Sequence, residues 1–263
     1  MNTNPLISCL CITKNSAALL LRAIECFEAQ TYENRELLVL YETDNAEIEK
    51  VTQQKKQTGS AIQFIEIPAS PKQNLGGLRN LSIELCNGEF FSQWDDDDWY
   101  SADRLEVQLN QLVKENADVC FLGYWILFDH TNNTAYLSFK RNWEGTILCK
   151  KSLFNDDCKY ALLPRAEDTA FTKAIAQRYV DTQLLQPWVY IYTYHGNNTW
   201  EYSHFLRNFM LGEQLSAEFA VLIKNILSGR FSVEESTKLL QNKIYTNEIE
   251  EKIKLLQVRP KPE

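Results

Sequence analysis

Short apolar runs alternate with helix-like segments over the first hundred residues, and this alternation constrains the fold more than any other feature. The apolar runs are typical of strands buried on both faces and cover residues 6–12, 36–41, 62–67 and 88–94. The segments between them have helical spacing and cover residues 16–30, 46–57 and 77–86. This order predicts an α/β fold of the Rossmann-like type, a doubly wound and mostly parallel central sheet with flanking helices.

Polar residues follow three of these strands. They are Thr13-Lys14-Asn15, Glu42-Thr43-Asp44-Asn45 and Asp95-Asp96-Asp97-Asp98. Ligands of such sheets bind beyond the carboxyl ends of the strands, so we expect the three groups to share one rim. The chain has no Gly-x-Gly-x-x-Gly after the first strand and no Walker Gly-Lys-Ser/Thr, which weighs against the usual dinucleotide and P-loop sites.

The run of four aspartates, bracketed by Trp94 and Trp99, carries the clearest chemical signal. Adjacent carboxylates repel one another unless a cation neutralises them. Oxygen ligands suit a hard ion such as Mg²⁺ or Mn²⁺, which binds a few carboxylates together with substrate phosphates. A solvated acidic loop is the alternative, but the strand before the run and the helix after it favour a metal–phosphate site.

The remaining sequence predicts helices at 101–115 and 167–178 and strands at 119–128, 135–139, 146–149 and 188–194. The strand at 135–139 would pair antiparallel with the strand at 119–128. From residue 204 onward the pattern is helical, with breaks at Gly212 and Gly229. We therefore expect a domain over residues 1–204, with halves that meet near residue 100, and a C-terminal helical extension over residues 205–263.

Two further features could carry chemistry. Glu167-Asp168 stands at the start of a predicted helix, where paired acids often serve as caps or complement the helix dipole. A carboxylate there could also act as a general base toward an acceptor hydroxyl. His195 ends an aromatic strand, either as a polar strand-end residue or as an additional ligand of a carboxylate-bound metal.

Charge and composition exclude several classes of protein. The formal charge of −8 argues against a nucleic-acid binder that relies on phosphate contacts. With 44% hydrophobic residues the chain can form a sizeable core. The seven cysteines include no Cys-x-x-Cys pair and are expected to be reduced, buried thiols. A polar N-terminus and the lack of a membrane-length apolar run predict a cytoplasmic protein.

Taken together, the motifs of residues 5–200 resemble the family 2 glycosyltransferases, inverting enzymes of the GT-A fold. Ile7 to Asn15 is similar to the opening strand and turn of the family, and Glu36 to Asp44 to the strand that ends in Asp-Asp-Gly-Ser. Asn74 to Asn80, followed by Asn87 to Phe91, resembles the passage Gly…Ala-Arg-Asn…Gly-Glu-Tyr. The aspartate run sits where the Asp-x-Asp motif lies, and Glu167-Asp168 matches the pair that supplies the base. Two departures are Lys14 in place of Tyr and Tyr41-Glu42 in place of Asp-Asp.

The resemblance implies transfer of a sugar from a nucleotide-diphosphate donor, most often a UDP-sugar, with Mn²⁺ or Mg²⁺ as cofactor. Residues 1–100 would then bind the nucleotide-sugar and residues 101–204 the acceptor, a glycan or a lipid-linked sugar of cell-surface polysaccharide synthesis. The implied donor-binding residues are Ile12, Thr13, Glu42, Asn74, Gly76, Arg79, Asp95 and Asp96. Asp97 and His195 would bind the metal, and Asp168 would deprotonate the acceptor.

Other functions remain open at this point. A nucleotidyltransferase also uses carboxylate-bound Mg²⁺, although Thr13 to Ser16 lacks the expected glycines. A phosphatase of the Asp-x-Asp-x-Thr type would need a threonine that the aspartate run lacks. A non-catalytic carbohydrate-binding protein of the same fold is the third alternative, because the six tryptophans could stack on sugars.

The start of the C-terminal extension is apolar, with Phe205, Leu206, Phe209, Met210 and Leu211 close together. We expect these residues to pack on the preceding domain. The alternative is peripheral contact with a membrane that holds a lipid-linked acceptor.

Overall fold

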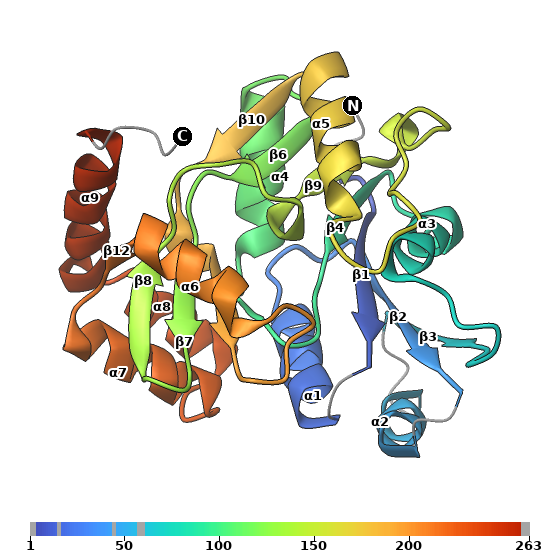
Figure 1. Cartoon of the computed structure of the whole chain (residues 1–263), viewed down its shortest axis with the longest axis horizontal. Coiled ribbons are helices and arrows are strands. Elements are labelled where there is room, and N and C mark those ends of the chain that lie inside the picture. The colour runs from blue at the N-terminus through green and yellow to red at the C-terminus, as the bar shows by residue number, and fades with distance from the viewer. Residues whose placement is uncertain (1–3, 15–16, 44–45, 57–60, 259–263) are drawn as a thin grey trace.

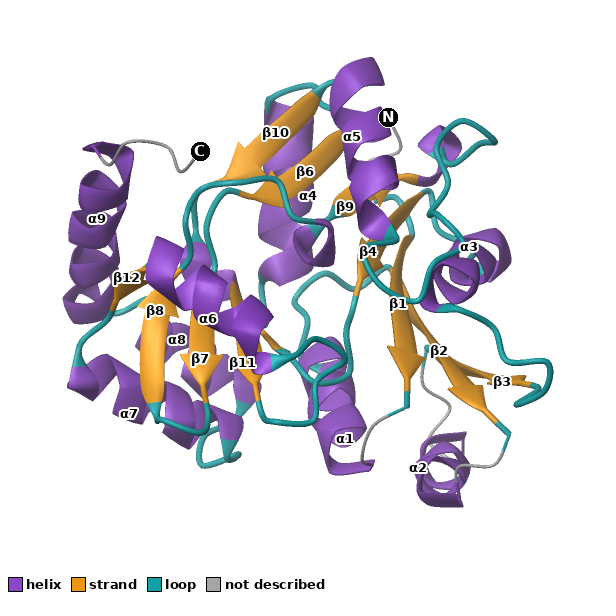
Figure 2. Ribbon diagram, in the orientation of Figure 1, coloured by secondary structure: helices purple, strands orange, loops and turns teal. Residues whose placement is uncertain are grey.

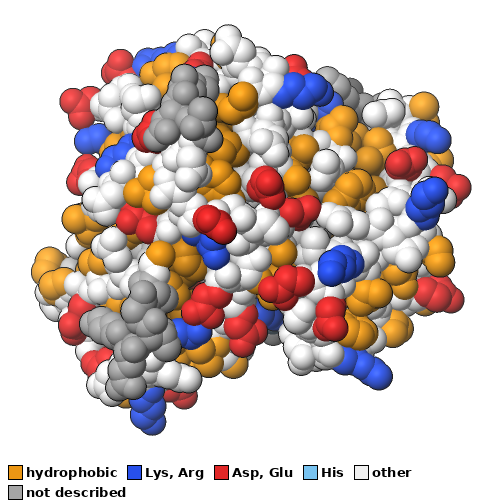
Figure 3. All heavy atoms as spheres, turned by 180° about the vertical axis from the view of Figure 1, so that it is seen from behind, with side chains coloured by type: hydrophobic (Ala, Val, Ile, Leu, Met, Phe, Trp, Pro, Cys, Tyr) orange, Lys and Arg blue, Asp and Glu red, His pale blue; other side chains and the backbone are white. Residues whose placement is uncertain are grey.

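The computed structural model describes residues 4–14, 17–43, 46–56 and 61–258. Two sheets lie side by side, with helices around them (Figures 1 and 2). The opposite face of the molecule carries acidic and basic side chains interspersed with hydrophobic ones (Figure 3). Among the described residues, no helix is long and apolar enough to span a membrane.

The first sheet has the strand order β10-β6-β9-β4-β1-β2-β3. Its strands are β1 (Ile7–Thr13), β2 (Arg35–Glu42), β3 (Ile62–Ile67), β4 (Phe90–Gln93), β6 (Val119–Leu122), β9 (Leu148–Lys150) and β10 (Asp181–Leu184). β9 runs antiparallel to both of its neighbours, and the other pairings are parallel. The predicted mostly parallel sheet is therefore confirmed.

Helices cover both faces of this sheet because both faces of its central strands are apolar. The helices are α1 (Ala17–Glu28), α2 (Ala46–Lys56), α3 (Leu75–Leu85), α4 (Arg104–Lys114) and α5 (Asp168–Arg178). Cys9 and Cys11 of β1 pack in one core with residues of α1, α2 and α4. Leu10, between them, packs in a second core with residues of α3 and α5, as the alternation of side chains along a strand requires. The structure is thus doubly wound.

The second sheet has the order β12-β8-β7-β11-β5. Its strands are β5 (Trp99–Tyr100), β7 (Ile126–Asp129), β8 (Thr134–Leu137), β11 (Tyr190–Tyr194) and β12 (Glu213–Gln214). The predicted antiparallel pairing of the 119–128 and 135–139 regions is confirmed between β7 and β8. Short 3₁₀ helices precede β9 and β11 and follow β9, at Glu144–Thr146, Pro187–Val189 and Lys151–Leu153.

The prediction of one continuous strand over residues 119–128 was wrong. The chain leaves the first sheet after β6, passes through residues 123–125 and enters the second sheet as β7. Every residue of this crossing is buried, so apolar character continues through it and does not mark the break. Gly123 is the local signal, because a Cβ atom there would lie 2.7 Å from the Leu185 side chain.

The C-terminal residues form α6 (Tyr202–Leu211), α7 (Ala217–Leu227), α8 (Val233–Leu240) and α9 (Lys243–Val258). The predicted breaks are confirmed: Gly212 caps α6, and Gly229 follows α7 with a φ of +71°. Figure 1 shows α6 in front of β7 and β8, with α9 at the outer edge. Phe205 and Phe209 of α6 are buried against Tyr192 and Tyr136, as expected. Leu206 and Met210, which were also expected to pack on the preceding domain, are exposed.

All seven cysteines lie in the described part of the chain, and all are buried free thiols, as predicted. Burial raises the pKa of Cys9 and Cys26 to about 12, so these thiols stay protonated and act as small apolar side chains.

Candidate active site

A cavity of about 380 Å³ opens at the carboxyl ends of β1 and β4, where the two sheets meet. Six predicted site residues line it, and they are Ile12, Arg79, Asp95, Asp96, Asp97 and Asp168. The expectation that strand ends would gather polar groups on one rim therefore holds for β1 and β4. Asn15, Asp44 and Asn45, which were part of the predicted rim, lie outside the described residues.

The four aspartates diverge, and each has different partners. Asp95 lies 3.4 Å from Nη2 of Arg79, and Oδ2 of Asp96 accepts a hydrogen bond from Oγ1 of Thr13 at 2.5 Å. Asp96 is only 3% exposed. Separate partners relieve the repulsion that four adjacent carboxylates would otherwise suffer, so the run is an organised site and not a solvated loop.

Asp98 anchors the run to the second sheet. Its carboxylate is fully buried and accepts hydrogen bonds from the Tyr190 hydroxyl and, at 3.0 Å, from the backbone N–H of Thr193 in β11. Burial, together with the charges of Asp97 and Asp95, raises the pKa of Asp98 well above its usual range. No sequence pattern distinguishes this residue from its three neighbours.

Asp97 faces the turn that follows β11. Its Oδ2 atom lies 3.1 Å from Nε2 of His195 and accepts a hydrogen bond from Nδ2 of Asn198 at 3.2 Å. Nη2 of Arg22 donates to the carbonyl oxygen of Asp97 at 2.6 Å and holds this part of the backbone. The structure therefore brings together the two residues that the sequence suggested as metal ligands.

These residues suit a divalent ion that a substrate helps to bind. No group of three or more His, Cys, Asp or Glu side chains is arranged to hold a metal among the residues that the structure describes. One carboxylate and one imidazole would leave the other ligands of Mg²⁺ or Mn²⁺ to be supplied by the phosphate oxygens of a diphosphate and by water. The donor set at Asp97 and His195 therefore fits an ion that arrives with its substrate.

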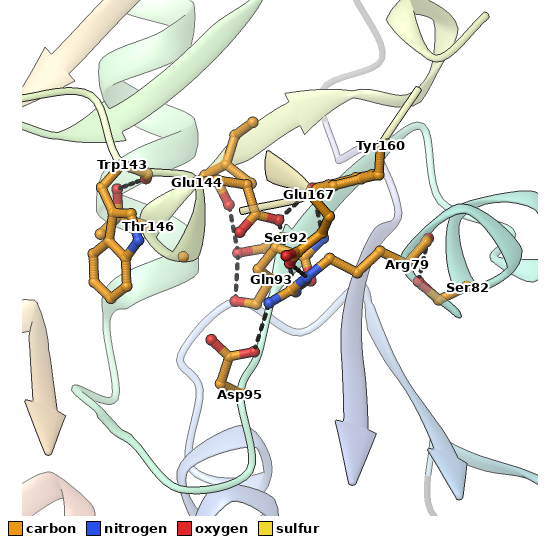
Figure 4. Close-up of polar contacts among 12 residues, drawn as sticks. Arg79, Ser82, Ser92, Gln93, Asp95, Trp143, Glu144, Thr146, Tyr160 and Glu167 are labelled. Carbon is orange, nitrogen blue, oxygen red and sulfur yellow. Dashed lines mark hydrogen bonds and ion pairs between the residues drawn. The ribbon is translucent and has the colours of Figure 1, made fainter. Parts of the chain in front are cut away.

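Arg79 of α3 is the centre of a buried charge network beside the aspartates (Figure 4). Its Nε atom donates to Glu167 at 3.0 Å, and Nη1 donates to Gln93 at 2.6 Å. Nη1 also lies 3.6 Å from Glu144, and Nη2 reaches Asp95. One guanidinium thus joins β4, the Glu144–Thr146 turn and the segment before α5.

Glu144 was not predicted, and no local pattern marks it. Its side chain is 2% exposed and accepts a hydrogen bond from the Tyr160 hydroxyl. Burial raises the pKa of Glu144 to about 8; the charge of Arg79 opposes this shift, while Asp168 and Asp95 add to it. Burial therefore favours the protonated form of Glu144 near neutral pH.

The two residues of the predicted Glu167-Asp168 pair lie in different environments. Glu167 is buried against Arg79, whereas Asp168 is the first residue of α5 and lines the cavity. Within the described residues, the Asp168 carboxylate has no hydrogen-bond or ion-pair partner. Ala166, just before the pair, has a φ of +56°, a strained backbone that turns the chain into the helix.

Asn74 and Gly76 lie at the start of α3 and do not line the cavity. Asn74 caps the helix by accepting a hydrogen bond from the backbone N–H of Gly77 at 2.8 Å. A Cβ atom on Gly76 would lie 1.8 Å from the carbonyl oxygen of Ala161. Both residues therefore fix how α3 meets the 161–167 segment that carries Asp168.

Glu42 ends β2 and is half-buried. The register pairs Thr13 with Tyr41, so Glu42 is the next residue beyond the end of β1. It does not line the cavity, and neither do Thr13 and His195, which contact the lining residues Asp96 and Asp97.

Several cavity residues come from the second half of the chain and were not predicted as site residues, among them Arg141, Trp143, Tyr192, Trp200 and His204. Of the six tryptophans, Trp143 and Trp200 line the cavity. Trp94, Trp99 and Trp125 are buried, and Trp188 packs against the core. Stacking of a sugar on tryptophan is therefore limited to two positions.

Comparisons with known proteins agree with this architecture. Residues 8–167 match the family described as glycosyl transferase family 2. The chain is 33% identical over 135 residues to an uncharacterized glycosyltransferase of Rickettsia felis, covering 49% of this chain and 21% of that protein. It is 25% identical over 130 residues to the putative glycosyltransferase EpsH of Bacillus subtilis, covering 49% of this chain and 37% of EpsH. The chain therefore spans well under half the length of these curated relatives.

Solved structures share the fold at low sequence identity. A structure of S. aureus TarS 1-349 in complex with UDP has a TM-score of 0.58 and 17% identity, over 85% of this chain and 71% of that one. The mannosyltransferase PcManGT from Pyrobaculum calidifontis, in complex with GDP-Man and Mn²⁺, has a TM-score of 0.58 and 11% identity, over 98% of this chain and 86% of that one. The fold is thus the GT-A fold of glycosyltransferases, and because the family match covers more than half of its residues, the chain belongs to glycosyl transferase family 2.

Proposed function

We propose that the protein is an inverting glycosyltransferase that moves a sugar from a UDP-sugar to an acceptor hydroxyl. The observation that carries this proposal is one cavity lined by two separate carboxylates. One is Asp97, whose Oδ2 atom lies 3.1 Å from Nε2 of His195, and the other is Asp168, which has no hydrogen-bond or ion-pair partner among the described residues. The pair suits a cation bound to a diphosphate, and the separate carboxylate suits a general base. TarS has been solved with UDP and with UDP-GlcNAc, which supports a nucleotide-sugar as the donor of this family member.

The donor would lie along the carboxyl ends of β1, β2 and β4. Ile12, Thr13 and Glu42 would contact the base, and Asp95 and Asp96 the ribose and the first phosphate. Thr13 already holds the Asp96 carboxylate, so these two groups are positioned before the donor arrives. Arg79 would act mainly by keeping Asp95 in place, and Asn74 and Gly76 by fixing α3.

Asp97 and His195 would hold Mn²⁺ or Mg²⁺. When bound, such an ion neutralises the charge that develops on the leaving diphosphate. Asn198 donates to Asp97 and orients its carboxylate, and Arg22 holds its backbone, so the ligands are fixed by the protein in advance.

Asp168 would accept the proton of the acceptor hydroxyl. As that oxygen attacks the anomeric carbon, a new carbon–oxygen bond forms and the bond to the diphosphate breaks on the opposite face. A single displacement of this kind inverts the anomeric configuration. Asp168 is the first residue of α5 and lines the cavity, so its carboxylate can reach an acceptor hydroxyl that binds there.

The test is titration and turnover with nucleotide-sugars. We expect UDP to bind the purified protein in the presence of Mn²⁺ and more weakly after chelation, and we expect a UDP-sugar to release UDP slowly even without an acceptor. GDP-mannose serves as the competing donor, since PcManGT was solved with it. Binding without any turnover across a donor and acceptor panel would favour a carbohydrate-binding protein, and release of pyrophosphate from a nucleoside triphosphate would favour a nucleotidyltransferase.

A lipid-linked acceptor would require the cavity to approach a membrane. The exposed side chains of Leu206 and Met210 on α6, near His204 of the cavity, support such a contact. Replacing both residues with Glu should abolish binding to lipid vesicles if α6 is the contact, and unchanged binding would exclude it.

A further inference from the structure

Arg141 lines the cavity, and the proposed reaction gives it no role. It lies between β8 and the Glu144–Thr146 turn, and its side chain is half-buried. The guanidinium carbon lies 5.2 Å from the ring centre of Trp125 and 4.8 Å from that of Phe139. The two rings fix the position of the cation while one side of it lines the cavity.

Among the described residues, none accepts a hydrogen bond from the Arg141 side chain. Its Nε atom is buried without a hydrogen-bond partner, and no carboxylate of the described residues lies within 4.0 Å of its guanidinium. Arg79 lines the same cavity, but its guanidinium is paired with three carboxylates, those of Glu167, Glu144 and Asp95. A buried N–H without an acceptor is costly, and the part of the guanidinium that lines the cavity is open to an acceptor that comes from outside the chain.

Arg141 belongs to the part of the cavity where the acceptor would bind. The carboxylate whose charge acts most on it is that of Asp168, the proposed base. His204 of α6 also lines this part of the cavity, and its ring stacks on Trp200 at 4.6 Å. Burial and the positive charges of Arg141 and Arg207 lower the pKa of His204, and the charge of Asp168 opposes this shift. The carboxylates of the aspartate run lie toward β4.

We propose that Arg141 binds an oxyanion, a phosphate or a carboxylate, of the acceptor, and thereby places the neighbouring hydroxyl at Asp168. The acceptor would then be an anionic sugar or glycan and not a neutral one. A planar guanidinium presents paired N–H groups that match the oxygens of either anion, and the apolar rings beside it strengthen the contact by excluding water. This inference rests on the proposed function, because it assigns the base to Asp168.

The experiment titrates two small probes, inorganic phosphate and acetate, into protein saturated with UDP and Mn²⁺, so that the donor region is occupied. Binding is followed by NMR through the indole N–H signals of Trp143 and Trp200. We expect Arg141→Gln to weaken binding of the preferred anion at least about tenfold, as for the loss of a charge-assisted hydrogen bond. Arg141→Lys keeps the positive charge but lacks the paired N–H groups of the guanidinium, so it should bind the preferred anion more weakly than the wild type does.

Arg230→Gln is the matched control, because it removes the same charge from an exposed residue after α7 that does not line the cavity. It should leave both titrations unchanged. Stronger binding of phosphate indicates a phosphorylated acceptor, and stronger binding of acetate indicates a sugar acid. Equal affinity in the wild type and Arg141→Gln would overturn the inference, provided that both proteins bind UDP. Failure of the wild type to bind UDP would instead refute the proposed function.

Discussion

Nε2 of His195 lies 3.1 Å from Oδ2 of Asp97, although 98 residues separate them in the sequence. The contact forms because β5, which follows the aspartate run, pairs directly with β11, which His195 follows. Asn198 completes the arrangement by donating both to Asp97 and to the carbonyl oxygen of Thr193. The two candidate ligands are therefore positioned by sheet pairing and not by a flexible loop.

Substitution of either ligand should weaken metal-dependent binding of UDP. Loss of a residue that merely orients a ligand typically costs 10–100-fold in metal affinity, so His195→Ala and Asp97→Ala should each cost at least about tenfold. Calorimetric titration of UDP with Mn²⁺, and again after chelation, measures the effect. Asp118→Asn, which breaks an ion pair with Lys150 in another part of the molecule, is the control. Tight binding by Asp97→Ala with the same response to chelation would contradict the ligand assignment.

Asp168→Asn should stop transfer and spare donor binding. The amide is nearly the same size as the carboxylate but cannot accept the proton, and a general base contributes roughly 10²–10⁴-fold to rate. Steady-state release of UDP in the presence of acceptor gives the rate, and a UDP titration gives the affinity. Asp156→Asn, at an almost fully exposed carboxylate, should behave as the wild type. Full activity of Asp168→Asn would remove this residue from the role of base.

Gly76→Ala should lower both stability and activity. The new methyl group would collide with the carbonyl oxygen of Ala161, so the backbone before Asp168 has to move, at a cost of about 1–3 kcal/mol or more. Gly77→Ala is the matched control, since its Cβ atom would lie 3.3 Å from Asn74 and helix propensity favours alanine. Urea unfolding and turnover should separate the two variants. Equal stability of the two variants would show that the backbone of residues 161–167 can move at little cost in free energy.

Glu144 should make the protein less stable as pH rises. The pKa of Glu144 is about 8 in the folded protein, whereas the ordinary value for a glutamate is 4.5. The folded state therefore binds the proton of Glu144 more tightly than the unfolded chain does. Between these pH values the unfolded chain ionises first, and the free energy of unfolding falls by about 1.4 kcal/mol per pH unit until Glu144 itself ionises. The groups around Glu144 are Arg79, Tyr160, Glu167, Asp168 and Asp95.

Glu144→Gln measures this effect, because the amide imitates the protonated acid. The unfolding free energy of the variant relative to the wild type should rise from pH 5 to pH 8.5, as followed by urea unfolding at several pH values. Subtracting the wild-type curve removes the contribution of other titrating groups. A difference that stays constant with pH would mean that Glu144 is ionised throughout.

The first half of the fold could be predicted because its information is local. Continuous apolar runs such as 36–41 mark strands buried on both faces, and the helices between them show their own spacing. The break between β6 and β7 could not be predicted, since a crossing between two buried sheets is as apolar as a strand. β5 and β12 have two residues each, too few to show any period.

The residues of the candidate site also fall into those that could be predicted from sequence and those that could not. Asp97 and Asp168 belong to short motifs whose order along the chain is informative, so sequence alone named them. Glu144 and Arg141 have no motif, and their importance comes from burial and from partners far away in the sequence. Asp98 is the clearest example of what sequence alone could not predict. Its three neighbours are of the same residue type, and Asp98 is buried only because β5 pairs with β11.

The aspartate run is also the connection between β4 of one sheet and β5 of the other. An ion bound at Asp97 and His195 would stabilise this connection, because it would join a residue of the connection to the turn that follows β11. Loading the protein with UDP and Mn²⁺ should therefore slow amide hydrogen exchange on both sides of the junction, in strands that never touch the nucleotide.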